Sequence, residues 1–182
     1  MPARVLVLFA HPALQKSRIN VHLAAAARGV AGITFHDLYE AYPDFDINVT
    51  HEQKLLREHD VVVLQHPFYW YSCPALLKEW LDLVLEYGFA YGPGGTALTG
   101  KSLLSALTTG GPAAAYTREG INRFTMTEFL APFIQAAGLC GMHWLPPSII
   151  HGSVRLVRPD EIADHATRYA QLLTRLRDGN AV

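Results

Sequence analysis

Two continuously apolar runs, 5-VLVLFA-10 and 61-VVVL-64, constrain the fold of this chain more than any other feature. A strand with one face in water alternates apolar and polar residues, whereas a strand covered on both faces is apolar throughout. Both runs are therefore predicted to be inner strands of a sheet with helices on both faces. Strand-like runs alternate with helical patterns along the whole chain, which indicates a doubly wound α/β fold.

The expected elements are five strands and five helices. Thr50 and Gln53 are predicted to form a capping box at the second helix, and Pro132 to bend the fourth. No linker or repeat interrupts the pattern, so residues 1–182 are expected to form one domain. The predicted strands cover residues 4–10, 33–38, 61–66, 102–109 and 142–150, and the predicted helices cover residues 18–30, 51–59, 75–87, 121–138 and 159–177.

Composition narrows the classes of partner. With 15 Lys and Arg against 16 Asp and Glu, the net charge is −1, which argues against nucleic acid as the main partner. Two cysteines make neither a disulfide framework nor a thiolate metal site, which fits a reducing cytoplasm. The segment 129–154 lacks Asp, Glu, Lys and Arg, but Pro146 and Pro147 interrupt it. A buried helix followed by a buried strand is expected there, not a membrane span.

Ligands of doubly wound sheets bind beyond the carboxyl ends of the strands, at the point where the strand order reverses. Right-handed crossovers allow two common orders, and in the order 2-1-3-4-5 this point lies between the first and third strands. The segments to inspect are then 11-HPALQKSRIN-20, 66-HPFYWYS-72 and 108-TTGGPAAAY-116. They are also the least ordinary segments of the chain, which favours a site at this edge.

The first segment carries Lys16, Ser17, Arg18 and Asn20 at a predicted helix N-terminus. Free backbone N–H groups, the helix dipole, a hydroxyl and two cations suit a phosphate. The simpler interpretation is an ordinary N-cap with solvated charges, which many helices have. Neither a P-loop nor the glycine pattern of a dinucleotide-binding turn is present.

The other two segments complete a hypothetical ligand site. Residues 68–71 offer a flat aromatic wall, and Gly110 and Gly111 let backbone N–H groups approach a ligand, although two glycines more often mark only a turn. A ligand with a phosphate at one end and a planar hydrogen-bonding ring at the other would use all three segments. FMN has this shape and brings redox chemistry that side chains lack.

Several motifs, in a constant order, resemble the flavodoxin-like NAD(P)H:quinone oxidoreductases, and among them the ancillary proteins of bacterial glutathione-regulated potassium-efflux systems. The resemblance implies a flavodoxin-like, five-stranded parallel sheet of order 2-1-3-4-5 and a homodimer with flavin sites at the subunit interface. The motifs are 10-AHP-12, 42-YPDF-45, 65-QHPFYWYSCPALLKEWLD-82, 90-AYGPGGTALTGK-101, 107-LTTGG-111 and 144-WLPP-147.

The resemblance also implies which residues bind the flavin. The phosphate would be held by His11, Ser17, Arg18, Ile19 and Asn20. The ring would be flanked by Pro67, Phe68, Tyr69, Trp70 and Tyr71, with backbone amides near Trp70 and Tyr71 facing its N5 edge. The pyrimidine edge, where negative charge develops on reduction, would be bound by Thr108, Thr109, Gly110 and Gly111.

Two residues after the glycine pair are implied to be catalytic. Tyr116 occupies the position of a family tyrosine that stabilises the reduced flavin. The family places a histidine six residues later, where this chain has Asn122. An amide donates hydrogen bonds but does not titrate near neutral pH, so we expect no proton relay through this side chain.

The implied function is a cytoplasmic enzyme that transfers hydride from NAD(P)H through FMN, or alternatively FAD, to a quinone or similar electrophile by a ping-pong mechanism. The alternative is a regulatory subunit of a potassium-efflux transporter, held at the inner face of the membrane, with a structural or sensory flavin. No metal is expected. His11 and His66 end adjacent predicted strands and could be neighbours, but no carboxylate accompanies them.

Overall fold

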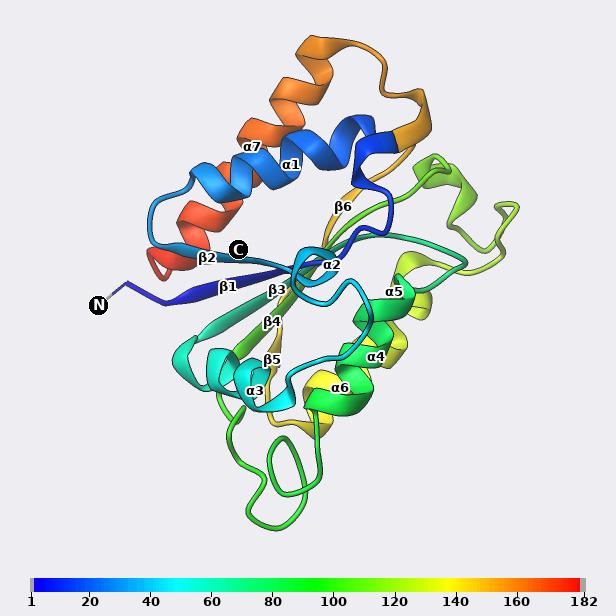
Figure 1. The fold of residues 1–182 in the computed structure, drawn as a ribbon. Coiled ribbons are helices and arrows are strands. Elements are labelled where there is room, and N and C mark those ends of the chain that lie inside the picture. Colours follow the sequence, from blue (N-terminus) through cyan, green and yellow to red (C-terminus); the bar gives the residue numbers. More distant parts are fainter. Residues whose placement is uncertain (1, 181–182) are drawn as a thin grey trace.

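The computed structural model describes residues 2–180 and shows a twisted parallel sheet between two layers of helices (Figure 1). The strand order is β2-β1-β3-β4-β5, with β6 also paired to β4, and every pairing is parallel. This confirms the flavodoxin-like order. The strands are β1 (Val5–Phe9), β2 (Ile33–Asp37), β3 (Val61–Pro67), β4 (Ser102–Thr108), β5 (His143–Trp144) and β6 (Ser148–Ile150).

The two helical layers explain why the inner strands are apolar throughout. Val5 and Val7 of β1 pack in the cluster beneath α1 (Arg18–Gly29) and α7 (Pro159–Arg177), whereas Leu6 and Leu8 pack in the opposite cluster. Alternate side chains of one strand thus enter two separate cores. The opposite layer contains α2 (Leu38–Ala41), α3 (Val49–Glu58), α4 (Ala75–Val84), α5 (Met126–Phe129) and α6 (Ala131–Leu139) (Figure 1). Single 3-10 turns occur at η1 (Leu14–Lys16), η2 (Ala113–Ala115) and η3 (Ser153–Arg155).

The fifth predicted strand, residues 142–150, is broken into β5 and β6. Proline has no N–H to donate to a sheet, so Pro146 and Pro147 interrupt the ladder. Ser102 of β4 pairs with His143, and Ala106 of β4 pairs with Ser148. The two residues of β4 are four positions apart, whereas their partners are five positions apart. One extra residue is therefore accommodated between the two pieces, as in a β-bulge.

Two helix starts also differ from expectation. The predicted helix 121–138 begins only at Met126, where Thr125 and Glu128 form a capping box, and it is divided at Leu130 into α5 and α6. At α3 the cap is Asn48, whose Oδ1 accepts from the His51 N–H (3.0 Å), so the predicted Thr50 capping box was wrong.

The charge-free segment 129–154 forms α6 and the two short strands. The prediction of a buried helix was wrong: in α6 only Phe133 and Ala137 are buried, and Leu139 is 60% exposed, so α6 is a surface helix with one buried side. The strand β6 is half-buried rather than buried, because it lies at the edge of the sheet. No helix between residues 2 and 180 combines the length and the apolarity needed to cross a membrane.

Candidate cofactor site

A cleft of about 520 Å³ opens beyond the carboxyl ends of β1, β3 and β4. This edge is the switch point of the strand order, and the volume lies within the roughly 300–1,000 Å³ usual for small-molecule sites. All three segments singled out in the sequence contribute to it. The cleft is lined by His11, Ala13, Lys16, Ser17, Arg18, Ile19, Asn20, Pro67, Phe68, Tyr69, Thr108, Gly110, Ser153 and Val154.

One end of the cleft is the N-terminus of α1. Ser17 caps this helix, and its Oγ accepts from the backbone N–H of Asn20 (3.1 Å) and from Asn20 Nδ2 (3.0 Å). Because Ser17 Oγ is the acceptor in both bonds, its own proton stays free to donate. The N–H groups of Arg18 and Ile19 lie in the first turn, where no intrahelical carbonyl is available. Together these donors suit an anion such as a phosphate.

Asn20 holds this end of the cleft together. It is buried, and its Nδ2 also donates to Thr108 Oγ1 (3.0 Å), so one amide ties α1 to the end of β4. The Ile19 side chain is in the core, which leaves only its backbone for a ligand. Lys16 and Arg18 are exposed and form no ion pair with any residue of the described chain, so both are available to an anion.

His11 adds a directed donor. The Ala13 N–H donates to His11 Nδ1 (3.2 Å), so in the neutral imidazole the proton is on Nε2. Burial lowers the pKa of His11, which favours that neutral form. The ring lies edge-on to Tyr69, with centroids 6.0 Å apart. His11 can therefore donate from Nε2 without carrying a charge.

The other end of the cleft is a tight turn after β3. Tyr69 and Ser72 form an antiparallel bridge, and the Ser72 N–H donates to the Tyr69 carbonyl (3.0 Å). Between them, Trp70 and Tyr71 have φ of 47° and 63°. Two positive φ values are typical of a type I′ turn, which normally uses Asn or Gly and strains other residues by about 1–2 kcal/mol each. The N–H groups of Trp70 and Tyr71 have no acceptor within residues 2–180.

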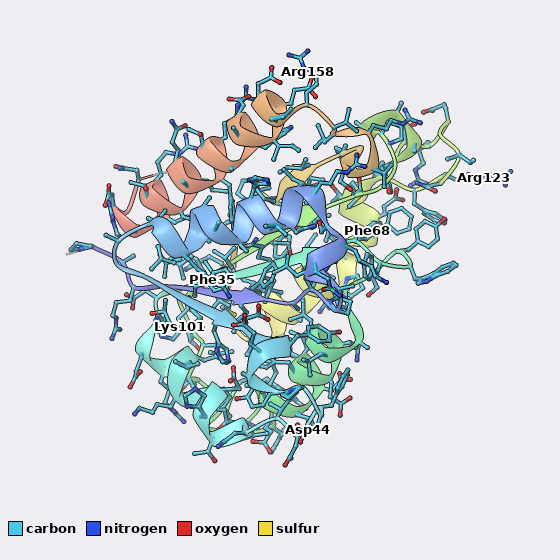
Figure 2. All side chains as sticks on the ribbon, turned by 45° about the horizontal axis from the view of Figure 1, so that its top comes forward. Phe35, Asp44, Phe68, Lys101, Arg123 and Arg158 are labelled. Atoms are coloured by element: carbon cyan, nitrogen blue, oxygen red, sulfur yellow. The ribbon has the colours of Figure 1, made fainter. Side chains whose placement is uncertain are left out.

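The four consecutive aromatics divide by environment. Phe68 packs against Phe129 (centroids 5.5 Å apart), and Tyr71 stacks on the same ring at 5.3 Å. Tyr69 borders the cleft, whereas Trp70 is 93% exposed. Figure 2 shows the labelled Phe68 at this end of the molecule, with further aromatic side chains between it and the projecting Arg123. Phe68 is therefore partly buried, whereas the other three rings are exposed, Tyr71 with one face on Phe129.

The loop after β4 supplies free backbone donors. Thr109 N–H donates to the Ile150 carbonyl (2.9 Å), and its hydroxyl donates to the Gly111 carbonyl (2.8 Å). The N–H groups of Gly110 and Gly111 have no acceptor in the described part of the chain. A Cβ at Gly111 would lie 3.3 Å from the Tyr116 hydroxyl, which is tight, so the loop approaches that side chain closely.

The two predicted catalytic residues lie on the rim beside this loop. Tyr116 packs edge-on against Phe68, with centroids 5.9 Å apart. Asn122 Oδ1 accepts weakly from the Tyr71 hydroxyl (3.4 Å). Neither lines the cleft, and the same is true of Trp70, Tyr71, Thr109 and Gly111. The predicted residues thus form one continuous surface with an inner, cleft-lining part and an outer rim.

One wall of the cleft, formed by Ser153 and Val154, was not predicted from the sequence. Gly152 N–H donates to the Gly111 carbonyl and Ser153 N–H to the Thr109 carbonyl, both at 2.8 Å. These bonds hold Ser153 and Val154 at the edge of the cleft. The only sign of this wall in the sequence is that the segment directly follows the last predicted strand. Its position in space depends on the register in which β6 pairs with β4.

His11 and His66 do not form a metal site together. His66 is buried and stacks on Phe133 of α6, with centroids 5.9 Å apart, while His11 faces the cleft. A different group, His36, His51 and Glu52, places ligand atoms within 4.8 Å of one another. The Glu52 carboxylate already accepts from three side chains, which explains its burial without an ion. The donors are Tyr42 (2.5 Å), His36 (2.8 Å) and Trp80 (2.8 Å).

Comparison with known proteins gives consistent results. Residues 3–173 match a family described by its flavodoxin-like fold. The chain is 53% identical to the glutathione-regulated potassium-efflux system ancillary protein KefG of Escherichia coli O6:K15:H31 (strain 536 / UPEC) over 172 residues, which cover 94% of this chain and 93% of that protein.

Two solved structures are also similar. General stress protein 14 of Treponema denticola, in complex with FMN, has a TM-score of 0.88 and 39% identity over 95% of this chain and 99% of that one. An NADPH-quinone reductase from P. pentosaceus has a TM-score of 0.83 and 35% identity over 93% of this chain and 96% of that one.

Proposed function

The chain belongs to the family of proteins with a flavodoxin-like fold, and we propose that it is an FMN-dependent NAD(P)H:quinone oxidoreductase. The observation that carries the proposal is a cleft with anion donors at one end and, at the other end and on its rim, backbone N–H groups that have no acceptor among residues 2–180. Similar chains include one crystallised with FMN and one named an NADPH-quinone reductase, which supports the same assignment.

The described residues fit FMN in size and in chemistry. Ser17, the first-turn amides of α1 and His11 Nε2 would hold the phosphate, with Lys16 and Arg18 adding positive charge. When bound, FMN would supply the two-electron redox chemistry that links NAD(P)H to a quinone or similar electrophile in the ping-pong order. The chain would provide binding, orientation and electrostatics.

At the ring end, backbone groups would do most of the binding. The N–H groups of Trp70 and Tyr71 would face one edge of the ring, and those of Gly110 and Gly111 the pyrimidine edge. Tyr116 and Asn122, on the rim, would contact the reduced ring or the second substrate. Tyr69 would shield one side of the ring from water.

A second copy of the chain would complete this end as a homodimer. Trp70 is 93% exposed and Ile121 is 86% exposed, and both lie on the rim or in the loop next to it. Large exposed apolar side chains gathered around a site favour coverage by a partner surface. Size-exclusion chromatography with light scattering tests this; a monomer at all concentrations contradicts it.

A second candidate function is the regulatory one. The 53% identity to KefG, an ancillary protein of a potassium-efflux system, favours a transporter partner at the inner face of the membrane. Both functions can reside in one protein, so they need separate tests. Co-purification with the transporter, measured with and without FMN, tests the regulatory function without requiring turnover.

The visible spectrum of the purified protein tests the enzymatic proposal. We expect a flavin spectrum, either as purified or after FMN is added, and bleaching by NADH or NADPH without oxygen. Ser17→Ala should weaken FMN binding by about tenfold, because it removes a hydrogen bond to a charged group. Thr167→Ala, on the exposed surface of α7, is the matched control. Failure to bind FMN contradicts the proposal, and binding without bleaching leaves only the regulatory function.

A further inference from the structure

His151 lies beside the loop that is proposed to bind the pyrimidine edge. β6 pairs with β4 in the register Thr108 with Ile150, so the next residues, Thr109 and His151, are also neighbours. Thr109 Oγ1 is 3.0 Å from His151 Nδ1. Nothing in the sequence pattern marks this histidine, which follows an apolar strand and is far in sequence from the three segments of the site.

The hydrogen bonds determine where the proton of His151 is. A threonine hydroxyl has one proton, and Thr109 donates it to the Gly111 carbonyl (2.8 Å). Thr109 Oγ1 must therefore be the acceptor in its bond with His151, so His151 Nδ1 carries a hydrogen and donates it. In the neutral ring, Nε2 is then the nitrogen with the free lone pair.

Nε2 of His151 is available for a proton. It has no hydrogen-bond partner among residues 2–180, yet it is not sealed from solvent. Tyr116 is the titratable side chain packed against the ring, with centroids 5.4 Å apart and planes at 35°. No Asp, Glu, Lys or Arg of the described chain forms an ion pair with His151. Burial lowers its pKa, so the ring is neutral near pH 7.

We propose that His151 is the positioning and proton-holding residue of the pyrimidine edge, held by Thr109 through Nδ1–H and able to take a proton at Nε2. This inference rests on the proposed flavin function. Through the hydrogen bonds from His151 to Thr109 and from Thr109 to Gly111, the imidazole also holds the loop that carries Gly110, which lines the cleft.

The chemical reason is charge. A flavin gains negative charge at its pyrimidine edge when it accepts a hydride, which carries two electrons and one proton. His151 would then bind one further proton from solvent at Nε2, becoming a cation next to that negative charge. The electrons stay on the flavin, and the proton returns to solvent when the charge leaves. Asn122 cannot act in this way, because an amide does not titrate near neutral pH.

The test is an NMR titration of His151 in the full-length protein, in three states: apo, with oxidised FMN, and with FMN reduced by dithionite without oxygen. We expect the Nδ1–H tautomer in the apo protein. Reduction should raise the proton affinity of His151 by about tenfold or more, as a nearby opposite charge does. His151→Gln identifies the signal, and His143→Gln, an exposed residue of β5, is the control.

The midpoint potential gives a second readout. The measurement covers about pH 5.5 to 8, a range that brackets the usual histidine pKa of about 6.5. Within it, the midpoint potential of the wild type should depend on pH more steeply than that of His151→Gln. An Nε2–H tautomer, or an equal proton affinity of His151 in the oxidised and reduced states, would overturn the inference. If FMN binds and is reduced in that case, the proposed function stands; if FMN does not bind, both fail.

Discussion

The two ends of the cleft are built in opposite ways. At the phosphate end, Ser17, Asn20 and Thr108 are joined by hydrogen bonds of 3.0–3.1 Å, and Asn20 is buried. At the ring end, Trp70 and Tyr71 have left-handed backbones and exposed side chains, and their N–H groups have no acceptor in the described part of the chain. The side chains of the phosphate end bond to one another within the folded core, whereas the backbone donors of the ring end are left for a ligand.

This difference separates stability from binding. A network that is already satisfied stabilises the protein whether or not a ligand is bound. A strained turn with unpaired donors gains its partners only when a ligand or a second subunit covers it. Substitutions at the phosphate end should therefore change the free energy of unfolding, and those at the ring end should change affinity more than folding.

The largest expected effect is that of pH on His66, which lies beneath the ring end. Its Nδ1 donates to the Pro67 carbonyl (3.0 Å), its buried Nε2 has no partner among residues 2–180, and burial lowers its pKa to about 4. The unfolded pKa is about 6.5, so this contribution to stability is complete above pH 6.5 and is lost as the pH falls toward 4. We expect His66 to account for a loss of about 3 kcal/mol over that interval.

Urea unfolding of the wild type and of a His66 variant at several pH values measures this loss. Carboxylates that titrate in the same interval are present in both proteins, so the difference between them reports His66 alone. His66→Asn, which does not titrate, should flatten the pH dependence between pH 6.5 and 4. If the free energy of unfolding of the variant depends on pH as steeply as that of the wild type, the titration of His66 does not contribute to stability.

The next effect is that of Asn20→Ala. The substitution removes the amide that joins Ser17 and Thr108 and leaves buried polar atoms without partners, which should destabilise the apo protein by about 2 kcal/mol. Thermal or urea unfolding without FMN measures it. Asn48→Ala, at an exposed cap, is the matched control, with an expected loss of about 1 kcal/mol. Equal losses would contradict the view that the phosphate end belongs to the core.

The smallest effect concerns the turn. Trp70→Gly should make the apo protein more stable than Trp70→Ala by about 1 kcal/mol, because glycine accepts the positive φ without strain. Both variants should stay folded and lose FMN affinity or hydride-transfer rate, since both remove the indole. Urea unfolding and FMN titration measure the two quantities. If Trp70→Ala binds FMN and turns over normally, the aromatic wall has no role in the site.

The sheet was predictable because its main signal is local. Runs such as 61-VVVL-64 indicate burial on both faces, whereas the choice between two strand orders came from the family resemblance. Helix starts were less predictable, because several polar residues can cap one helix: Asn48 does so instead of Thr50, only two positions away. The break at Pro146 and Pro147 was visible as a pair of prolines, but not as a change of register.

The site was partly predictable for the same reason. Gly110, just after β4, and Ser17, at the start of the helix that follows β1, line the cleft, since the carboxyl ends of parallel strands share one edge. Ser153 and Val154 were missed, because their place depends on pairing between segments more than 40 positions apart. The positive φ of Trp70 was also not predicted, since an aromatic residue does not favour a left-handed backbone and so gives no signal for one in the sequence.

The extra residue between β5 and β6 has a consequence beyond the sheet edge. Side chains of a strand alternate, so a shift of one residue exchanges those that point to one face for those that point to the other. Had the pairing of Ser102 with His143 continued unbroken, Ile150 and not His151 would lie opposite Thr109. The spacing of the chain at two prolines thus determines that an imidazole, and not an alkyl group, contacts Thr109 next to the cleft.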